Sequence, residues 1–285
     1  MRIRAGFTLG YRCTQPTPML LALNLRPERR ADLVTDQTLA FDPPVPLHAY
    51  IDSFGNSCGR IVAPAGSITI STAFEIEDSG APDPIVPDAV QHEISALPDE
   101  VMVFLLGSRY CDTDRLSDFA WRQFGATPLG WARVQAICDF VHEHIDFGYQ
   151  HASPLRTAHD GFVEQRGVCR DFAHLAVTLC RCINIPARYC TGYLGDIGVP
   201  PDPAPMDFSA WFQVYLGGAW RTFDARHNKP RIGRILMAVG RDATDVALTT
   251  SFGATQLEVF KVVTEEIPDG AATAAPPRTT AAAAI

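Results

Sequence analysis

The sequence predicts an α+β protein in which an N-terminal antiparallel β domain precedes an α+β core. Within the first 80 residues, apolar side chains alternate with others along several segments, such as Ile3, Ala5, Phe7 and Leu9. A period of two is typical of β-strands. Over residues 131–145 and again over 169–183 the apolar spacing is three and four, which indicates helices. After residue 187 the period returns to two on both sides of Gly217 and Gly218, which predicts a hairpin.

Composition limits the classes of function. The chain has 285 residues, of which 47% are hydrophobic and 20% are charged, so most of it is expected to fold. A net charge of -8 argues against broad binding to nucleic acid or to anionic membranes. No apolar run has transmembrane length, and Met1 leads into an alternating strand rather than a signal peptide. We therefore expect a cytoplasmic protein that binds neither nucleic acid nor membrane, and the oligomeric state stays open.

The cysteines and histidines give no metal signature. The 8 cysteines are scattered, with no C-x-x-C pair and no paired zinc spacing, so reduced thiols without a metal or cofactor are expected. His142 and His144 flank a glutamate, but residues two apart on a helix do not share a face, and H-E-x-x-H is absent.

Composition also divides the chain into three regions. Residues 1–80 form the predicted β domain, with turn chemistry at Asp52–Asn56 and a Pro-rich linker at Asp78–Pro87. Residues 81–266 form the predicted core, with helices at 88–97, 115–124 and 131–145 and a last strand near 257–263. Residues 267–285 are rich in Ala, Thr and Pro and have little to bury, so they are predicted to be a disordered tail.

Cys169 stands where a helix is predicted to begin. Gly167 and Val168 end a loop, and the residues after Cys169 are apolar at spacings of three and four until Asn184 and Pro186 stop the helix. The free amides and the dipole at a helix start favour a thiolate and can stabilise an oxyanion. Cys169 is therefore a candidate nucleophile. The alternative is a small cysteine that only packs the start of the helix.

The hairpin around Gly217 and Gly218 supplies a candidate acid. Folding at the glycines is expected to place residue 209 roughly across from Asp224. In a cysteine enzyme, a histidine at 209 would accept the thiol proton and Asp224 would orient its ring. Position 209 is Ser. Asp224 can equally be a structural cap at the end of a strand.

These segments resemble the transglutaminase-like superfamily. The resemblance lies in Gly167-Val-Cys-Arg-Asp-Phe-Ala-His-Leu175, Ala210-Trp-Phe-Gln-Val-Tyr-Leu216 and Trp220-Arg-Thr-Phe-Asp224. Bacterial members similarly carry a β domain before the core, and Asp52-x-Phe-Gly-Asn56 resembles its usual turn, so the resemblance extends to about Glu266. It implies a papain-like α+β core with a Cys–His–Asp triad, in which Cys169 corresponds to the nucleophile and Asp224 to the acid. The histidine of the family corresponds to Ser209.

The resemblance leaves two functions open. As an enzyme, the protein would use Cys169 to attack an amide or peptide bond and form a thioester, which water or an amine resolves, so peptides or proteins are the expected substrates. Ser209 cannot act as a base, but a bend at Ala225 or Arg226 would let His227 substitute for the missing histidine. Alternatively, the protein is a catalytically silent member whose cleft binds a peptide or a protein. The polar residues of 228–253 either line the cleft or hold a loop by ion pairs, and these are Arg231, Arg234, Arg241, Asp242 and Asp245.

Overall fold

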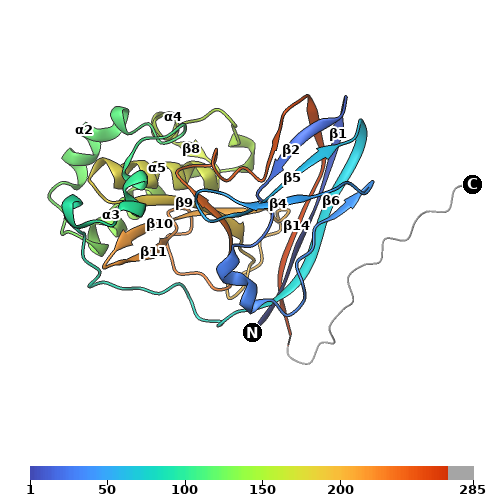
Figure 1. Ribbon diagram of the computed structural model, residues 1–285. Coiled ribbons are helices and arrows are strands. Elements are labelled where there is room, and N and C mark those ends of the chain that lie inside the picture. Colours follow the sequence, from blue (N-terminus) through green and yellow to red (C-terminus); the bar gives the residue numbers. More distant parts are fainter. Residues whose placement is uncertain (269–285) are drawn as a thin grey trace, which may run out of the picture.

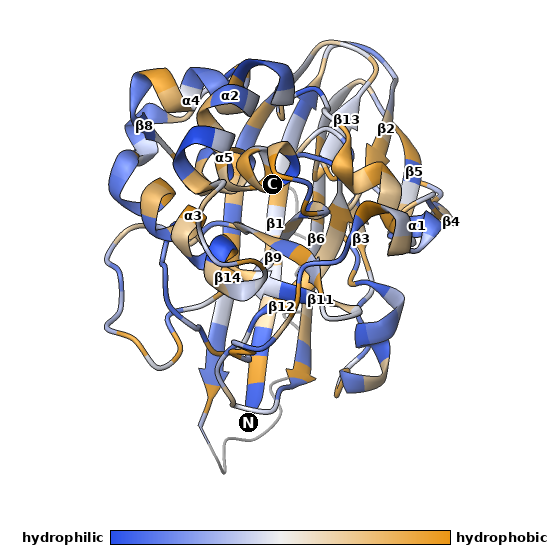
Figure 2. Ribbon diagram, turned by 90° about the vertical axis from the view of Figure 1, so that its left-hand side faces the viewer, coloured by the Kyte–Doolittle hydropathy of each residue, from blue (hydrophilic) through white to orange (hydrophobic). Residues whose placement is uncertain are grey.

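The computed structural model describes residues 1–268. Two antiparallel β-sheets lie beside an α+β core (Figure 1). One sheet has the strand order β14-β1-β6-β3, formed by Thr255–Ile267, Arg2–Cys13, Gly66–Glu77 and Ala40–Asp42. The other has the order β13-β2-β5-β4, formed by Thr249–Ser251, Thr17–Leu21, Ser57–Ala63 and His48–Ile51. Hydrophilic and hydrophobic stretches alternate along the long strands (Figure 2), and the apolar set is buried between the sheets.

The two strands nearest the C-terminus complete these N-terminal sheets. β14 pairs antiparallel with β1 from Arg2↔Ile267 to Cys13↔Thr255, and β13 pairs with β2. The predicted core extends to residue 266, so the structure differs here from the division drawn on the sequence. The reason is that an alternating pattern shows a strand but does not show its partner. The predicted tail, 267–285, lies outside the described residues apart from its first two.

The core packs helices on one face of an antiparallel sheet (Figure 1). The sheet has the order β11-β10-β9-β12, formed by Ala219–Phe223, Ser209–Leu216, Ala187–Tyr193 and Ile235–Gly240. The helices are α2, α3, α4 and α5, at Thr113–Phe124, Trp131–His144, Ala158–Glu164 and Cys169–Cys182. The strands β7 and β8, at Asp146–Phe147 and Arg166–Gly167, form a short parallel pair before α5. The α+β class with antiparallel sheets is confirmed.

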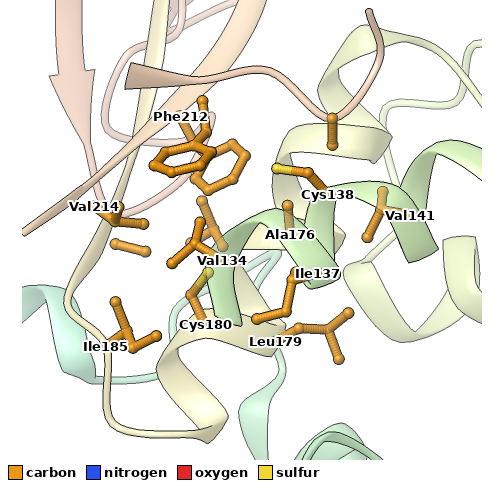
Figure 3. Close-up of a cluster of buried hydrophobic side chains, with 14 of the residues drawn as sticks. Val134, Ile137, Cys138, Val141, Ala176, Leu179, Cys180, Ile185, Phe212 and Val214 are labelled. Carbon is orange, nitrogen blue, oxygen red and sulfur yellow. The ribbon is translucent and has the colours of Figure 1, made fainter. Parts of the chain in front are cut away.

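A contiguous apolar cluster fixes α5 in place (Figure 3). Val134 and Ile137 of α3 meet Leu179 of α5, and Phe212 and Val214 of β10 close the cluster from the sheet. All five side chains are fully buried. Burial of each such side chain contributes about 1.5–3 kcal/mol to the stability of the fold. This packing therefore holds α5, and the residue at its start, in a fixed position. Within residues 1–268, none of the helices combines the length and apolar character that a membrane crossing needs.

The helix predicted at 88–97 is wrong. The structure has only a 3-10 turn, η2 at Ile94–Ala96, in this segment, followed by α1 at Asp99–Met102 and η3 at Val103–Leu105. The backbone pairs with other segments instead, since Ala89 O accepts from Trp131 N and Val90 O accepts from Gly217 N. A helix would remove these partners.

The turn at Asp52–Asn56 binds the free edge of the core sheet. Asn56 is 1% exposed. Its Oδ1 accepts from Val239 N at 2.9 Å, and its Nδ2 donates to Val239 O at 2.8 Å. Arg26 and Asp52 bind the other sides of the same amide. The side chain therefore acts as a short extra strand that caps β12 and joins the N-terminal part to the core.

Replacing Asn56 with alanine is expected to lower the free energy of unfolding by about 2–3 kcal/mol, because the buried N–H and C=O of Val239 lose their partners. Urea unfolding followed by circular dichroism measures the change. Ser53→Ala in the same turn is the control and is expected to change stability little. Equal losses in the two variants would contradict the role of Asn56.

Candidate active site

The start of α5 is fixed by Asp171. Cys169 is the first residue of the helix, as predicted, and Val168 precedes it in an extended conformation. The Val168 N–H donates to Asp171 Oδ2 at 2.8 Å, and Arg156 pairs with the same carboxylate oxygen at 3.3 Å. A Cβ on Gly167 would lie 2.6 Å from Asp171 Cβ, so only glycine fits beside the capping carboxylate. The loop, the glycine and the aspartate together hold Cys169 at the positive end of the helix.

Cys169 is the accessible cysteine of the chain. All eight cysteines lie in the described part and are free, and Cys169 alone is partly exposed while the others are buried. Burial, helped by the nearby Asp207 carboxylate, raises the pKa of its thiol to about 11. Arg226 and the backbone N–H of Ala210 act in the opposite direction. The resting sulfur is therefore a thiol near neutral pH, and nucleophilic attack needs a base.

A bend after β11 brings His227 against Asp224. The backbone N–H of His227 donates to Asp224 Oδ1 at 3.0 Å, and Asn228 N donates to Asp224 O at 2.8 Å. This turn spans Ala225 and Arg226, so His227 does not point to the opposite face as it would in a continuous strand. Its Nδ1 lies 2.8 Å from Asp224 Oδ2.

The pairing sets the protonation of the imidazole. Burial raises the pKa of Asp224, but the charge of Arg234 and the contacts of His227 outweigh it and hold that pKa well below its usual range. The group is therefore a carboxylate, which only accepts hydrogen bonds. His227 Nδ1 must carry the proton, and in the neutral ring Nε2 is left with a free lone pair.

Cys169, Ser209 and His227 line one cavity of about 270 Å³. Tyr149, Asp207 and Arg226 complete its polar wall. The Pro-rich loop of residues 195–207 also lines it, through residues that include Val199, Pro200, Pro205 and Met206. Among residues 1–268, no hydrogen bond joins the Cys169 thiol to an imidazole. The structure thus brings the candidate nucleophile and His227 to the same cavity, and the His227 ring is paired with Asp224.

Ser209 is displaced from the position expected across from Asp224. The two-residue turn pairs Leu216 with Ala219, and the register continues to Phe212↔Phe223. The partner position of Asp224 is therefore residue 211, and Ser209 lies two residues beyond it on the same face. Gly217 and Gly218 have φ values of 58° and 76°, as this tight turn requires. The Ser209 hydroxyl is buried and has no hydrogen-bond partner within the described residues.

Three other histidines, His142, His144 and His174, hold parts of the fold. His174 is fully buried, burial lowers its pKa to about 3, and its Nε2 accepts from Ala243 N at 3.1 Å. His142 and His144 bind the backbone oxygens of Ala225 and Phe162, so the two rings hold separate segments. His151 and His159 do not line the cavity of Cys169.

Of the polar residues in 228–253, some hold loops and others lie at the cavity. Arg241 forms an ion pair with Asp245 at 2.9 Å, and Asp242 binds the backbone of Tyr110, so these residues hold loops. Arg231, in contrast, lines the cavity, and Arg234 contacts Asp224. Asp207 and Arg226 are site residues that the sequence analysis did not single out as such. No local motif marks them, because their roles depend on which charges the fold brings near them.

Charge changes at Asp207 and Arg226 are expected to alter the reactivity of Cys169 in opposite directions. Asp207→Asn removes a negative charge, favours the thiolate and should raise the alkylation rate at pH 8 by about threefold. Arg226→Gln removes a positive charge and should lower the rate by a similar factor. Limiting iodoacetamide followed by peptide mapping measures both rates, and a shift in the same direction for the two variants would contradict the electrostatic assignment.

Comparison with known proteins agrees with this fold and site. The family model of the transglutaminase-like superfamily matches residues 120–225, which include Cys169, Ser209 and Asp224. An uncharacterised protein of Mycobacterium leprae is 36% identical over 120 residues, which are 40% of this chain and 42% of that protein. The match thus spans less than half the length of this curated relative. The crystal structure of a candidate cysteine protease from Cytophaga hutchinsonii has a TM-score of 0.78 at 28% identity, covering 93% of this chain and 90% of that one. Residues 120–225 thus match the transglutaminase-like superfamily, and the fold as a whole is similar to that of the Cytophaga hutchinsonii protein.

Proposed function

We propose that the protein cleaves or transfers an amide or peptide acyl group through a thioester on Cys169, with His227 as the base and Asp224 as its orienting acid. The observation that carries the proposal is the 2.8 Å contact between His227 Nδ1 and Asp224 Oδ2, at a cavity that the Cys169 residue also lines. The pair supplies the imidazole that Ser209 cannot. A peptide or protein substrate is part of this proposal.

The reaction follows from the protonation of the site. His227 Nε2 accepts the thiol proton as the sulfur attacks the carbonyl carbon, and the amides at the start of α5 stabilise the oxyanion. The imidazolium then donates that proton to the leaving amine, and a thioester remains. Water or a second amine attacks the thioester, His227 accepts its proton, and the thiol is restored. The product is an acid in the first case and a new amide in the second.

A catalytically silent protein is the second candidate. Two features favour it: residue 209, for which the resemblance to the family implies a histidine, is Ser, and the pKa of the Cys169 thiol is raised to about 11. Such a protein would use the same cavity to bind a peptide or a protein without forming a covalent intermediate.

Ser209→His separates the two candidates. In a His227→Gln background, the new imidazole reaches the cavity from residue 209 and is expected to restore at least one decade of the lost acylation rate of Cys169. This corresponds to about 1.4 kcal/mol of barrier. In the wild-type background the same change should add little, because His227 already serves. The probe is p-nitrophenyl acetate, and mass spectrometry measures acetyl-Cys169.

Cys169→Ala is the control and should show no acetylation at this position. A silent protein would show no acetyl-Cys169 in the wild type and no effect of His227→Gln. That result would overturn the proposed catalytic function.

A further inference from the structure

Arg234 connects the acid of the proposed site to the linker. Its side chain is 8% exposed, its Nη2 donates to Asp224 Oδ2 at 2.7 Å, and its Nε donates to Asp83 Oδ2 at 2.8 Å. Asp83 lies within Asp78–Pro87, which the sequence marks only as a Pro-rich linker. This segment therefore contributes a carboxylate to the surroundings of the site.

Asp83 is itself held firmly. Its N–H donates to Arg231 O, its Oδ2 accepts from Arg231 N, and both distances are 2.9 Å. Next to it, Pro82 and Ile232 form an isolated β-bridge. The guanidinium of Arg234 is planar and is bound by carboxylates at two of its nitrogens, Nε and Nη2, so its position does not depend on His227.

Asp224 needs a counter-charge because it is buried. The residue is 7% exposed, and a carboxylate removed from water is costly unless a cation compensates it. Within residues 1–268, the side chains that donate to it are those of Arg234 and His227. Without Arg234, the imidazolium form of His227 would be the one cation in contact with Asp224, and the carboxylate would hold the proton on the ring.

We propose that Arg234, anchored by Asp83, is a positioning residue that supplies the permanent counter-charge of Asp224, so that His227 can lose its proton near neutral pH. The role of the neutral ring as a base rests on the proposed function. The ionic arrangement itself does not, and it is tested separately.

Other titratable and charged groups line the cavity with His227, and these are Tyr149, Cys169, Asp207, Arg226, Lys229 and Arg231. None of their side chains forms a hydrogen bond with Asp224 among the described residues. Asp196 and Asp202 line the same cavity from the loop of residues 195–207. Asp196 accepts a hydrogen bond from Asp202 N at 2.7 Å and lies 3.9 Å from Arg231. These groups are the same in wild type and variants, so a comparison at position 234 isolates Arg234.

The experiment is an NMR titration of the full chain labelled with ¹⁵N-histidine, with His227 assigned by loss of its signals in His227→Gln. In the wild type we expect a neutral ring with the proton on Nδ1 at pH 8. Arg234→Met removes the charge and is expected to raise the titration midpoint of His227 by roughly one pH unit. Arg234→Lys keeps the charge and should restore the wild-type midpoint to within a few tenths of a unit. Circular dichroism verifies that each variant is folded.

The outcomes distinguish this inference from the proposed function. An unchanged or lowered midpoint in folded Arg234→Met overturns the counter-charge role. If that variant does not fold, Arg234→Gln replaces it. An imidazolium that persists at pH 8 in the wild type also overturns the role, without any variant.

If the midpoint rises but the wild type forms no acetyl-Cys169, the counter-charge role stands and the proposed catalysis fails. If both hold, the acid limb of the acetylation profile should move upward by the same roughly one unit in Arg234→Met.

Discussion

Replacing His227 with glutamine is expected to slow the acylation of Cys169 by about 10²- to 10⁴-fold, the usual contribution of a general base. Glutamine keeps a polar group beside Asp224 but cannot accept the thiol proton. The effect should be largest near neutral pH and should shrink as the pH approaches about 11, where the thiol ionises without help. Single-turnover acetylation by p-nitrophenyl acetate across this pH range measures the loss.

The matched control is His151→Gln. His151 contacts the neighbouring Gln150 side chain and does not line the cavity, so this change is expected to leave the acylation rate unaltered. Similar rates for His227→Gln and the wild type at pH 7 would remove His227 from the mechanism.

Asp224→Asn is expected to lower the acylation rate by about 10²- to 10⁴-fold, because the asparagine amide can turn its NH₂ toward His227 and favour the wrong tautomer. The variant should also lose stability, since Arg234 keeps its charge and loses one of its two carboxylate partners. Rate and urea unfolding are measured on the same preparation. Full activity with the tautomer unchanged would contradict the orienting role of Asp224.

The contribution of Asp224 to the free energy of unfolding is expected to fall as the pH is lowered. The pKa of Asp224 is lower in the folded protein than its ordinary value, so its ionisation stabilises the fold above about pH 4. That stabilisation is lost as the pH falls through the folded value. Acid unfolding of the wild type between about pH 4 and pH 2 should therefore be steeper than that of Asp224→Asn.

Local patterns were sufficient to predict the elements that carry the site. The spacing of apolar residues after Cys169 placed the start of α5 at that residue, and Asn184 ends the helix with a φ of 65°. The alternation around Gly217 and Gly218 predicted the hairpin. These features are set by residues close together in sequence, so the sequence shows them directly.

Contacts between residues far apart in the sequence, the bend at His227 and the exact register of the hairpin could not be predicted from local patterns. Asp83 and Arg234 are 151 residues apart, and neither belongs to a motif. The bend that turns His227 toward Asp224 depends on hydrogen bonds from two backbone amides to one aspartate, and the sequence offered it only as an alternative to a continuous strand. The register across the hairpin placed residue 211, rather than Ser209, opposite Asp224, an error of two positions that keeps the side chain on the correct face.

The most direct test of the account is the site and rate of acetylation of the wild-type chain by p-nitrophenyl acetate at pH 7, followed by intact mass and peptide mapping. We expect one acetyl group on Cys169, formed at least about 100-fold faster than in His227→Gln. Hydroxylamine at neutral pH should also remove the group, as expected for a thioester. Acetylation that avoids Cys169, or that proceeds equally fast without the imidazole of His227, would contradict the claim that Cys169, His227 and Asp224 act together.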